Sequence, residues 1–237
     1  MLELQTVDSS IGHLSHRLKS LPEHRALAQL AERRTDVIEA EGRTRTEVDD
    51  LAREQRKADA HVEQVKARRA RDQERIDSGS ISDAKQLTAL QHEVRTLDQR
   101  ISDLEDEELE VMERLEDSQA RLTRLEKELA QIESDADNLT SARDAAASKI
   151  AEQHSAAVAE REALAAEIPP ALLALYDKLR DQLGGVAVGA VQQKRCGGCH
   201  LNIGASDLAS MAAAPSDEVL RCEECDRILV RTSDSGL

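Results

Sequence analysis

Aromatic residues are almost absent from the sequence: among 237 residues there is no Phe and no Trp, and Tyr176 is the single Tyr. Aromatic side chains normally supply much of the area that a globular core buries. A chain without them has to bury Leu, Ile, Val and Ala in thin layers, as paired helices do. Ala, Glu, Arg and Leu dominate instead, a composition typical of long helices and coiled coils. The composition therefore argues against an ordinary globular domain.

Long apolar runs are missing too. No stretch approaches the ~18 apolar residues that a membrane-spanning helix needs. The N-terminal Met-Leu-Glu-Leu-Gln lacks the basic start and apolar middle of a signal peptide. The four cysteines occur only in two close pairs, which suits a reducing compartment. We therefore expect a cytoplasmic protein with no membrane partner.

Excess positive charge and catalytic motifs are also lacking. The formal net charge is −15, which disfavours a general grip on nucleic-acid phosphates. We find no Gly-x-x-x-x-Gly-Lys, Gly-x-Ser-x-Gly or His-Glu-x-x-His motif, and the 7 His residues are scattered over predicted helices. The sequence therefore predicts a protein that is not an enzyme.

Heptad seams dominate what is present. Residues 1–21 carry apolar side chains at alternating spacings of three and four, the seam of a coiled coil. At Ser20-Leu21-Pro22-Glu23 the register slips, and the Ser and Glu predict a capping box at a kink near residue 22. A weaker seam, interrupted by polar residues such as Thr44, follows up to residue 76. A turn is expected near 77–82, where Gly, Ser and Asp gather.

A second and cleaner seam runs from Leu87 to Leu164 and ends before Pro169-Pro170. Two long helices joined by a short turn predict an antiparallel coiled-coil hairpin over 1–168. Pairing Ile76 with Leu87 makes both arms end together, which favours the hairpin over a parallel dimer of extended helices. Because the first arm is weaker, either a partner covers the rest of the second arm or the hairpin is flexible.

The C-terminal part predicts a small separate module. Residues 169–185 are expected to form a docking helix and linker. Residues 186–237 contain two Cys-x-x-Cys pairs and are expected to form a C4 zinc ribbon. Strands are predicted at 186–191, 219–221 and 227–230, a short helix at 206–215, and a frayed tail from residue 232. The fold class is thus mainly α, a long antiparallel coiled-coil hairpin with a small C-terminal β-rich zinc ribbon.

All four cysteines lie in this module, as Cys196-x-x-Cys199 and Cys222-x-x-Cys225. Two such turns complete a tetrahedral site of four thiolates, which Zn²⁺ prefers. The alternatives are two disulfides, or one redox pair with a spare pair, and His200 is an alternative ligand. Four thiolates leave no open coordination position, so the sequence predicts one structural zinc ion and no metal-based catalysis. Arg195 and Arg221 are expected to offset the thiolate charge.

Charge is unevenly distributed along the hairpin. Residues 53–75 are rich in Arg and Lys, and residues 103–117 contain nine acids and one base. In the predicted register 103–117 faces 46–60, so part of the basic run is expected to form ion pairs across the seam. The bases near the tip are left without predicted partners. They form a candidate nucleic-acid or partner contact: Lys66, Arg68, Arg69, Arg71 and Arg75.

The chain resembles the bacterial C4-type zinc ribbon family, whose members include flagellar-biogenesis and sigma-factor-interacting proteins. The resemblance is carried by Cys196-Gly197-Gly198-Cys199-His200, by Cys222-Glu223-Glu224-Cys225-Asp226-Arg227-Ile228-Leu229, and by Lys85-Gln86-Leu87 at the tip. It departs at Asp226, where the family often has Gly, and at Gln86-Leu87, where the family commonly has Glu and an aromatic residue. The resemblance implies a non-enzymatic adaptor tied to transcription or RNA, and sometimes to flagellar assembly.

Together these patterns predict a zinc-binding adaptor that contacts protein or nucleic-acid partners, RNA more than DNA. We expect a monomer or a weak homo-oligomer. The alternative is a structural spacer or self-assembling scaffold that carries a stabilising zinc module.

Overall fold

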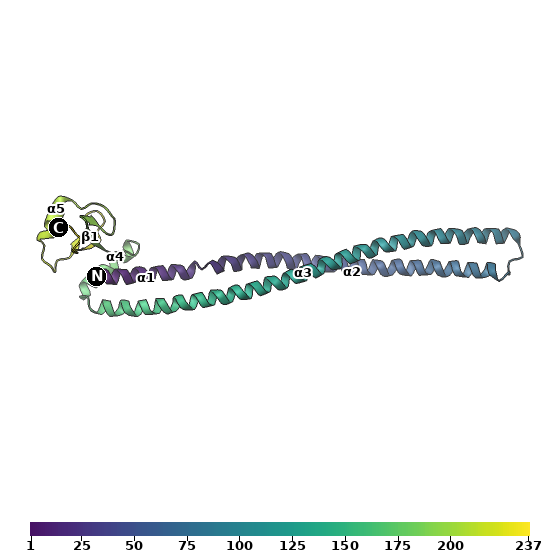
Figure 1. Ribbon diagram of the computed structural model, residues 1–237, viewed down its shortest axis with the longest axis horizontal. Coiled ribbons are helices and arrows are strands. Elements are labelled where there is room, and N and C mark those ends of the chain that lie inside the picture. Colours follow the sequence, from purple (N-terminus) through teal and green to yellow (C-terminus); the bar gives the residue numbers. More distant parts are fainter. The chain divides into compact units, whose positions relative to one another are not determined.

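The computed structural model describes all residues from Met1 to Leu237. Five helices and four short strands follow one another along the chain (Figure 1): α1 (Leu2–Lys19), α2 (Pro22–Asp77), α3 (Ala84–Ala166), α4 (Pro170–Gln182), β1 (Val188–Gln192), β2 (Arg195–Cys196), α5 (Ala205–Ala213), β3 (Leu220–Arg221) and β4 (Ile228–Val230). The predicted fold class, a mainly α helical hairpin followed by a small β-rich ribbon, is confirmed. No helix is long and apolar enough to cross a bilayer.

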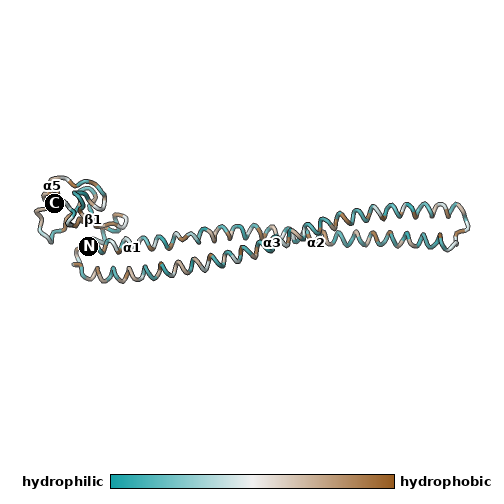
Figure 2. Tube along the Cα trace, viewed as in Figure 1, coloured by the Kyte–Doolittle hydropathy of each residue, from teal (hydrophilic) through white to brown (hydrophobic).

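The chain divides into two compact units, Ala26–Leu139 and a second unit made of Met1–Arg25 and Thr140–Leu237. In the first unit, α2 and α3 run antiparallel. Their ion pairs show the direction, because Arg33 meets Glu128, Lys66 meets Glu105 and Arg69 meets Asp98. Apolar positions recur among hydrophilic ones along both helices (Figure 2). The residues buried in this unit are Val37, Thr44, Leu51, Val62, Val94, Leu97, Leu104, Val111, Leu115, Ser118 and Ile132.

The hairpin turn is built by short polar residues. The backbone of Gly79 has a φ of 64°, a left-handed conformation that glycine adopts without strain. The Asp83 carboxylate then accepts the backbone N–H of Lys85 at 2.8 Å and so caps the start of α3. These contacts let the chain reverse direction between α2 and α3.

The break between α1 and α2 differs in detail from the sequence prediction. The Ser20 hydroxyl donates to the His16 carbonyl at 2.8 Å, so it bonds back into α1. One carboxylate oxygen of Glu23 is buried without a hydrogen-bond partner. The predicted capping box is therefore wrong: Ser20 ends α1 and does not cap α2. Pro22 begins α2, where its lack of an N–H costs nothing.

In the second unit, the ribbon packs on α1, the end of α3 and α4. The sheet has the order β2-β1-β4-β3, with β1 and β4 parallel and the other neighbours antiparallel. One apolar core joins these elements; its buried members are Leu4, Tyr176, Leu179, Ala187, Val188 and Ile228, with Leu172 and Leu175 partly buried against it. The apolar face of α4 therefore packs against the ribbon.

Gln5 of α1 fixes the start of the ribbon by hydrogen bonds. Its side-chain oxygen accepts the backbone N–H of Ala187 at 2.7 Å and that of Val188 at 3.1 Å. Its amide nitrogen donates to the Gly185 carbonyl at 2.8 Å. Gln5 thus satisfies buried peptide groups that no strand pairs, which explains why a polar side chain is buried here.

The C-terminal tail is bonded to the ribbon and not frayed as the sequence predicted. Ser235 is buried, and its hydroxyl donates to the Val191 carbonyl at 3.0 Å. The backbone N–H groups of Gln193 and Lys194 donate to the carbonyls of Asp234 and Ser235. The tail therefore lies against the β1–β2 turn and satisfies its peptide groups.

Candidate metal centre

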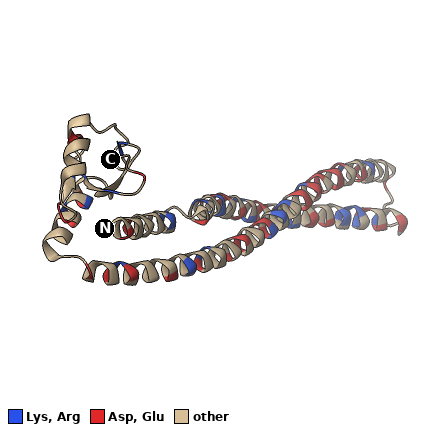
Figure 3. Ribbon diagram, turned by 60° about the vertical axis from the view of Figure 1, so that its left-hand side comes forward, with Lys and Arg blue, Asp and Glu red and all other residues tan.

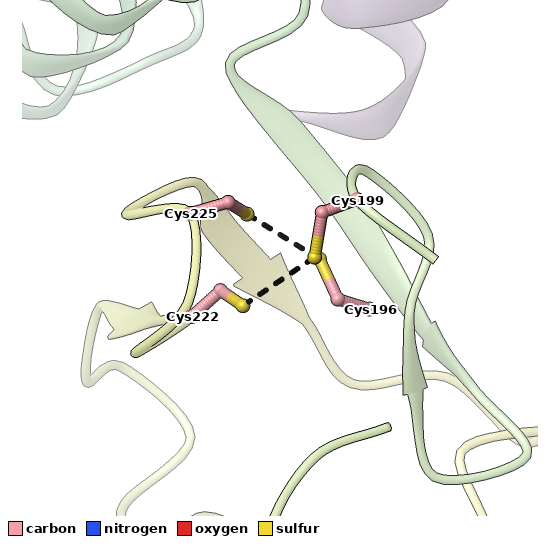
Figure 4. Close-up of side chains that lie close together, drawn as sticks. All are labelled: Cys196, Cys199, Cys222 and Cys225. Atoms are coloured by element: carbon pink, nitrogen blue, oxygen red, sulfur yellow. Dashed lines mark hydrogen bonds between the residues drawn. The ribbon is translucent and has the colours of Figure 1, made fainter. Parts of the chain in front are cut away.

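Each pair of cysteines sits on a turn next to a two-residue strand. β2 brings Cys196 opposite Val191 of β1, and the first turn follows up to Cys199. The second turn, Cys222–Cys225, connects β3 with β4, whose pairing closes it. Figure 4 shows the four side chains converging from the two turns. The sequence did not predict β2, because two residues are too short for a periodic signal.

The four sulfur atoms have the spacing of a tetrahedral metal site. All four Sγ atoms lie within 4.8 Å of one another. The Sγ atoms of Cys196 and Cys225 are 3.8 Å apart, and those of Cys199 and Cys222 are 3.9 Å apart. Zinc–sulfur bonds of ~2.3 Å place tetrahedral ligands roughly 3.8 Å from each other, whereas a disulfide bond is about 2.05 Å long. The geometry fits one zinc ion and excludes the disulfide alternative, since all four cysteines are free.

The thiols differ in how readily they lose a proton. Burial raises the pKa of Cys196, and it raises the pKa of Cys222 to about 12. Burial also acts upward on Cys225, but hydrogen bonds from the backbone and side chain of Arg227 outweigh it and lower that pKa to about 7. Zinc binds thiolates, so it has to displace protons, and its affinity falls as the pH falls.

The two bases that the sequence prediction placed beside the sulfurs have other partners. Arg195 donates to the Asn202 side chain at 2.9 Å, and Arg221 pairs with Asp226. Arg227 lowers the pKa of Cys225, and its guanidinium donates to the Val186 carbonyl at 2.8 Å. The assignment of charge compensation to Arg195 and Arg221 is therefore wrong. The sequence signal for an effect of Arg227 on Cys225 was its position, two residues after that last cysteine.

Glycines let the first turn approach its neighbours. The Gly197 N–H donates to the Ala190 carbonyl at 2.8 Å, and a Cβ on Gly197 would lie 2.7 Å from that oxygen. A Cβ on Gly198 would clash with Cδ of Arg227, and one on Gly189 would lie 2.6 Å from the Gly198 nitrogen. The Gly198 N–H points at Cys196 Sγ, 3.4 Å away. These glycines thus serve close packing against β1 and Arg227.

The left-handed positions of the two turns belong to other residues. His200 has a φ of 63° and Asp226 a φ of 60°, each directly after the second cysteine of its pair. His200 is exposed, and the cluster that can hold a metal contains the four cysteines without it. Asp226 offsets its strain by pairing with Arg221. The alternative of His200 as a ligand is not supported by the structure.

The basic residues near the tip of the hairpin are mostly paired. Lys66 Nζ lies 2.7 Å from a Glu105 oxygen, Arg69 Nε lies 2.9 Å from Asp98, and Arg75 lies 3.6 Å from Asp72. Arg68 pairs with Glu93, and Arg71 forms no ion pair. The hydrogen bond to Glu105 raises the pKa of Lys66. The sequence prediction that these bases lack partners is therefore wrong for four of the five: Glu105, Glu93 and Asp98 of α3 pair with three of them, and Asp72 of α2 pairs with Arg75.

Fold and site together define the class of protein: a coiled-coil hairpin that carries a four-cysteine zinc ribbon. The chain belongs to the CT398-like coiled-coil hairpin family, whose model matches residues 4–184. The model of the C4-type zinc ribbon domain matches residues 195–229. The predicted family resemblance and the single structural zinc ion are confirmed.

Relatives match over nearly their whole length. The uncharacterized protein Rv2229c of Mycobacterium tuberculosis is 35% identical over 231 residues, covering 98% of this chain and 94% of that protein. A solved structure from Mycobacterium smegmatis is 32% identical with a TM-score of 0.78, covering 97% of this chain and 95% of the other. CT398 from Chlamydia trachomatis has a TM-score of 0.67 at 19% identity, with coverage of 98% and 95%, and it shows the fold alone.

Proposed function

We propose that this protein is a non-enzymatic adaptor that binds another protein, with the zinc ion serving to fold the ribbon. The proposal rests on the closed metal site. Four cysteine sulfurs surround one position, so no coordination position is left for a substrate. The two matched domains, a coiled coil and a zinc ribbon, fit a structural or adaptor role.

A protein partner fits the hairpin surface better than a nucleic acid does. Lys and Arg occur together with Asp and Glu along the helices (Figure 3). The candidate contact at the tip keeps Arg71 as its single base without an ion pair. Nucleic-acid binding needs several Lys or Arg that are free to meet phosphates. Contact with RNA at the tip is therefore the second candidate function. The link to transcription that the family resemblance implies is part of the adaptor proposal.

The chain offers surface that a partner could cover. Leu109 of α3 is 55% exposed, and it lies in the acidic run 103–117. Asp106, Glu110 and Glu113 in that run have no ion-pair partner within the chain. An exposed Leu among unpaired acids suits a partner surface that is basic and partly apolar. This observation favours an adaptor over a spacer that only separates other parts.

Crosslinking mass spectrometry in intact cells tests the adaptor role. The protein is expressed at its native level, and the crosslinked peptides are assigned to the hairpin or to the ribbon. We expect recurrent crosslinks to one protein component, and their loss from the ribbon in a Cys222→Ser, Cys225→Ser variant. Crosslinks to RNA alone would replace the protein partner by the second candidate. Crosslinks only between copies of the chain would support the self-assembling scaffold and contradict the adaptor.

Light scattering tests the assembly state that we propose, a monomer or weak homo-oligomer in the cytoplasm. We expect the monomer mass at micromolar concentration, with at most a gradual rise at higher concentration. A stable large assembly at all concentrations would contradict this part of the proposal.

A further inference from the structure

One side of the ribbon sheet ends in a strand with an open edge. β3 is the last strand in the order β2-β1-β4-β3. The Ile228 N–H donates to the Ala187 carbonyl, so the peptide groups of Ile228 point toward β1. Arg221 lies opposite Ile228 in the antiparallel pair with β4. In an antiparallel pair, two opposite residues either exchange both backbone hydrogen bonds or direct their backbone groups away from each other. Because the Ile228 groups point toward β1, the N–H and C=O of Arg221 point away from β4, toward the open side of the sheet.

Two hollows flank this edge. One has a volume of about 620 Å³ and is lined by Leu172, Val219 and Val230 among others. The second has a volume of about 420 Å³ and is lined by Met211 and Pro215 among others. Leu220 and Glu218 border both hollows. Successive side chains of a strand point to opposite faces, so a strand added at β3 would direct its side chains toward the two hollows alternately.

Acidic side chains without ion-pair partners line both hollows. Asp217, Glu218 and Glu223 line them and have no ion-pair partner. The bases nearby are occupied, because Arg221 pairs with Asp226. The Arg231 guanidinium donates to the carbonyls of Met211, Ala214 and Pro215 at 2.6–2.8 Å. These neutral carbonyls leave the Arg231 charge in place, and Arg231 and Met1 line the first hollow. The acidic excess is therefore largest at the second hollow, where Asp207, Glu218 and Glu223 stand against one base, Arg221.

We propose that the β3 edge, defined as Val219, Leu220 and Arg221, binds an extended basic segment of a partner protein by strand addition. Val219 is 43% exposed and offers the apolar contact, and Arg221 offers the backbone hydrogen bonds. A second copy of this chain is a poor occupant, because pairing two β3 edges would bring two acidic rims together. The inference rests on the proposed adaptor function and specifies the chemistry of the partner.

Synthetic peptides test the edge on the full-length, zinc-loaded protein. The probe is an eight-residue peptide of alternating Val and Lys; its controls have the same composition with Val and Lys in separate blocks, or Glu in place of Lys. Backbone amide chemical shifts report the binding site. We expect the alternating basic peptide to shift the amides of 217–223 and 229–231, and both control peptides to bind about tenfold more weakly or less.

Two variants separate the backbone contribution from the side chain. Arg221→Pro removes the outward N–H, and Arg221→Ala removes the side chain but keeps the N–H. We expect the Pro variant to bind the peptide about tenfold more weakly than the Ala variant, since it lacks a backbone hydrogen bond. A measured zinc content of one ion per chain shows that each variant retains the ribbon. Equal affinity of the two variants overturns strand addition.

Charge reversal provides a second arm that leaves the strand unchanged. Asp217→Lys with Glu218→Lys is expected to weaken peptide binding about tenfold. The matched control is Glu160→Lys with Glu162→Lys, two exposed acids of α3 without ion pairs, which should leave it unchanged. Three results would each overturn the proposal. The first is an equal effect of the two charge-reversal pairs on peptide binding, and the second is the absence of any amide shift on β3 at millimolar peptide. The third is a set of β3 amide shifts that depend on protein concentration alone. If peptide binding at β3 fails but crosslinks in cells map to the hairpin, the adaptor role still holds. If no crosslink to any partner is found, the adaptor role itself is contradicted.

Discussion

The Tyr176 hydroxyl in α4 donates a hydrogen bond to the Asp8 carboxylate in α1 at 2.7 Å, although 168 positions separate the two residues. Asp8 also accepts from Arg161 of α3 at 2.8 Å and from Arg180 of α4 at 3.2 Å. One nearly buried carboxylate thus ties three helices together. Because α4 leads into the ribbon, this cluster fixes the base from which the zinc module starts.

Tyr176 is expected to titrate only at strongly alkaline pH. Burial, and then its hydrogen bond to Asp8, raises the Tyr176 pKa well above its ordinary value of 10.0. The stability gained from the neutral hydroxyl is therefore complete below pH 10.0 and is lost as the pH rises toward the folded pKa. Since Tyr176 is the single Tyr, ultraviolet absorbance follows it without overlap. We expect a folded midpoint well above that of the protein in urea, and coinciding midpoints would contradict the buried contact.

The Tyr176→Phe variant tests the same contact by stability. Removing the hydroxyl should lower the free energy of unfolding by about 1.5–3 kcal/mol near pH 8, because the hydrogen bond goes to a charged group. The difference from the wild type should shrink above pH 10.0, where the wild type loses its own contribution. Urea unfolding followed by circular dichroism at both pH values measures it. A difference that does not depend on pH would show that packing and not the hydroxyl accounts for the loss.

Gln5→Ala should loosen the start of the ribbon. The change leaves the N–H groups of Ala187 and Val188 without their acceptor, at a cost of about 1–3 kcal/mol for each buried group. Hydrogen exchange should speed up at these two amides and stay unchanged within 26–139. Gln153→Ala, at an exposed position of α3, is the matched control. Unchanged exchange at Ala187 would refute the role given to Gln5.

His200→Gly should stabilise the zinc ribbon by about 1 kcal/mol, because glycine adopts a positive φ without strain. Asp226→Gly should be nearly neutral, since relief of the same strain is offset by loss of the ion pair with Arg221. The rate of zinc transfer to a chromogenic chelator measures both. Faster zinc loss in His200→Gly would instead identify His200 as a ligand.

Glycine-to-alanine changes should have opposite effects in the ribbon and in the helices. Gly189→Ala should destabilise the ribbon strongly, because the new Cβ would lie 2.6 Å from a backbone nitrogen. Gly12→Ala in α1 should stabilise the helix by about 1 kcal/mol, since nothing lies within 4 Å of its Cβ. Thermal unfolding of the zinc-loaded proteins compares the two. Similar melting temperatures for both variants would contradict the close approach of β1 and the first cysteine turn.

The sequence predicted the features that repeat or have a fixed spacing. Seam positions gave the two helical arms, and the cysteine spacing gave the metal. Thr44 lies at a seam position and is buried, although its polar side chain was interpreted from the sequence as an interruption of the seam. These signals are local, so a single chain is enough to detect them.

Contacts between distant segments could not be predicted in the same way. Gln5 and Asp8 are polar residues beside an apolar seam, and nothing in their neighbourhood indicates that they meet Ala187 or Tyr176. The partner of Lys66 depends on which long side chains reach across the hairpin, a detail that the heptad pattern leaves open. The tail at Ser235 has no periodicity, yet it completes the hydrogen bonding of the β1–β2 turn.

We expect zinc to hold the ribbon together and the hairpin to stay folded without it. Hydrogen exchange measured by mass spectrometry, before and after chelation of one zinc ion per chain, tests it most directly. We expect residues 186–231 to lose protection on chelation, while the helical segments within 26–139 exchange as before and circular dichroism keeps most of its helical signal. Loss of most of the helical signal, or a ribbon that stays protected without zinc, would contradict the account.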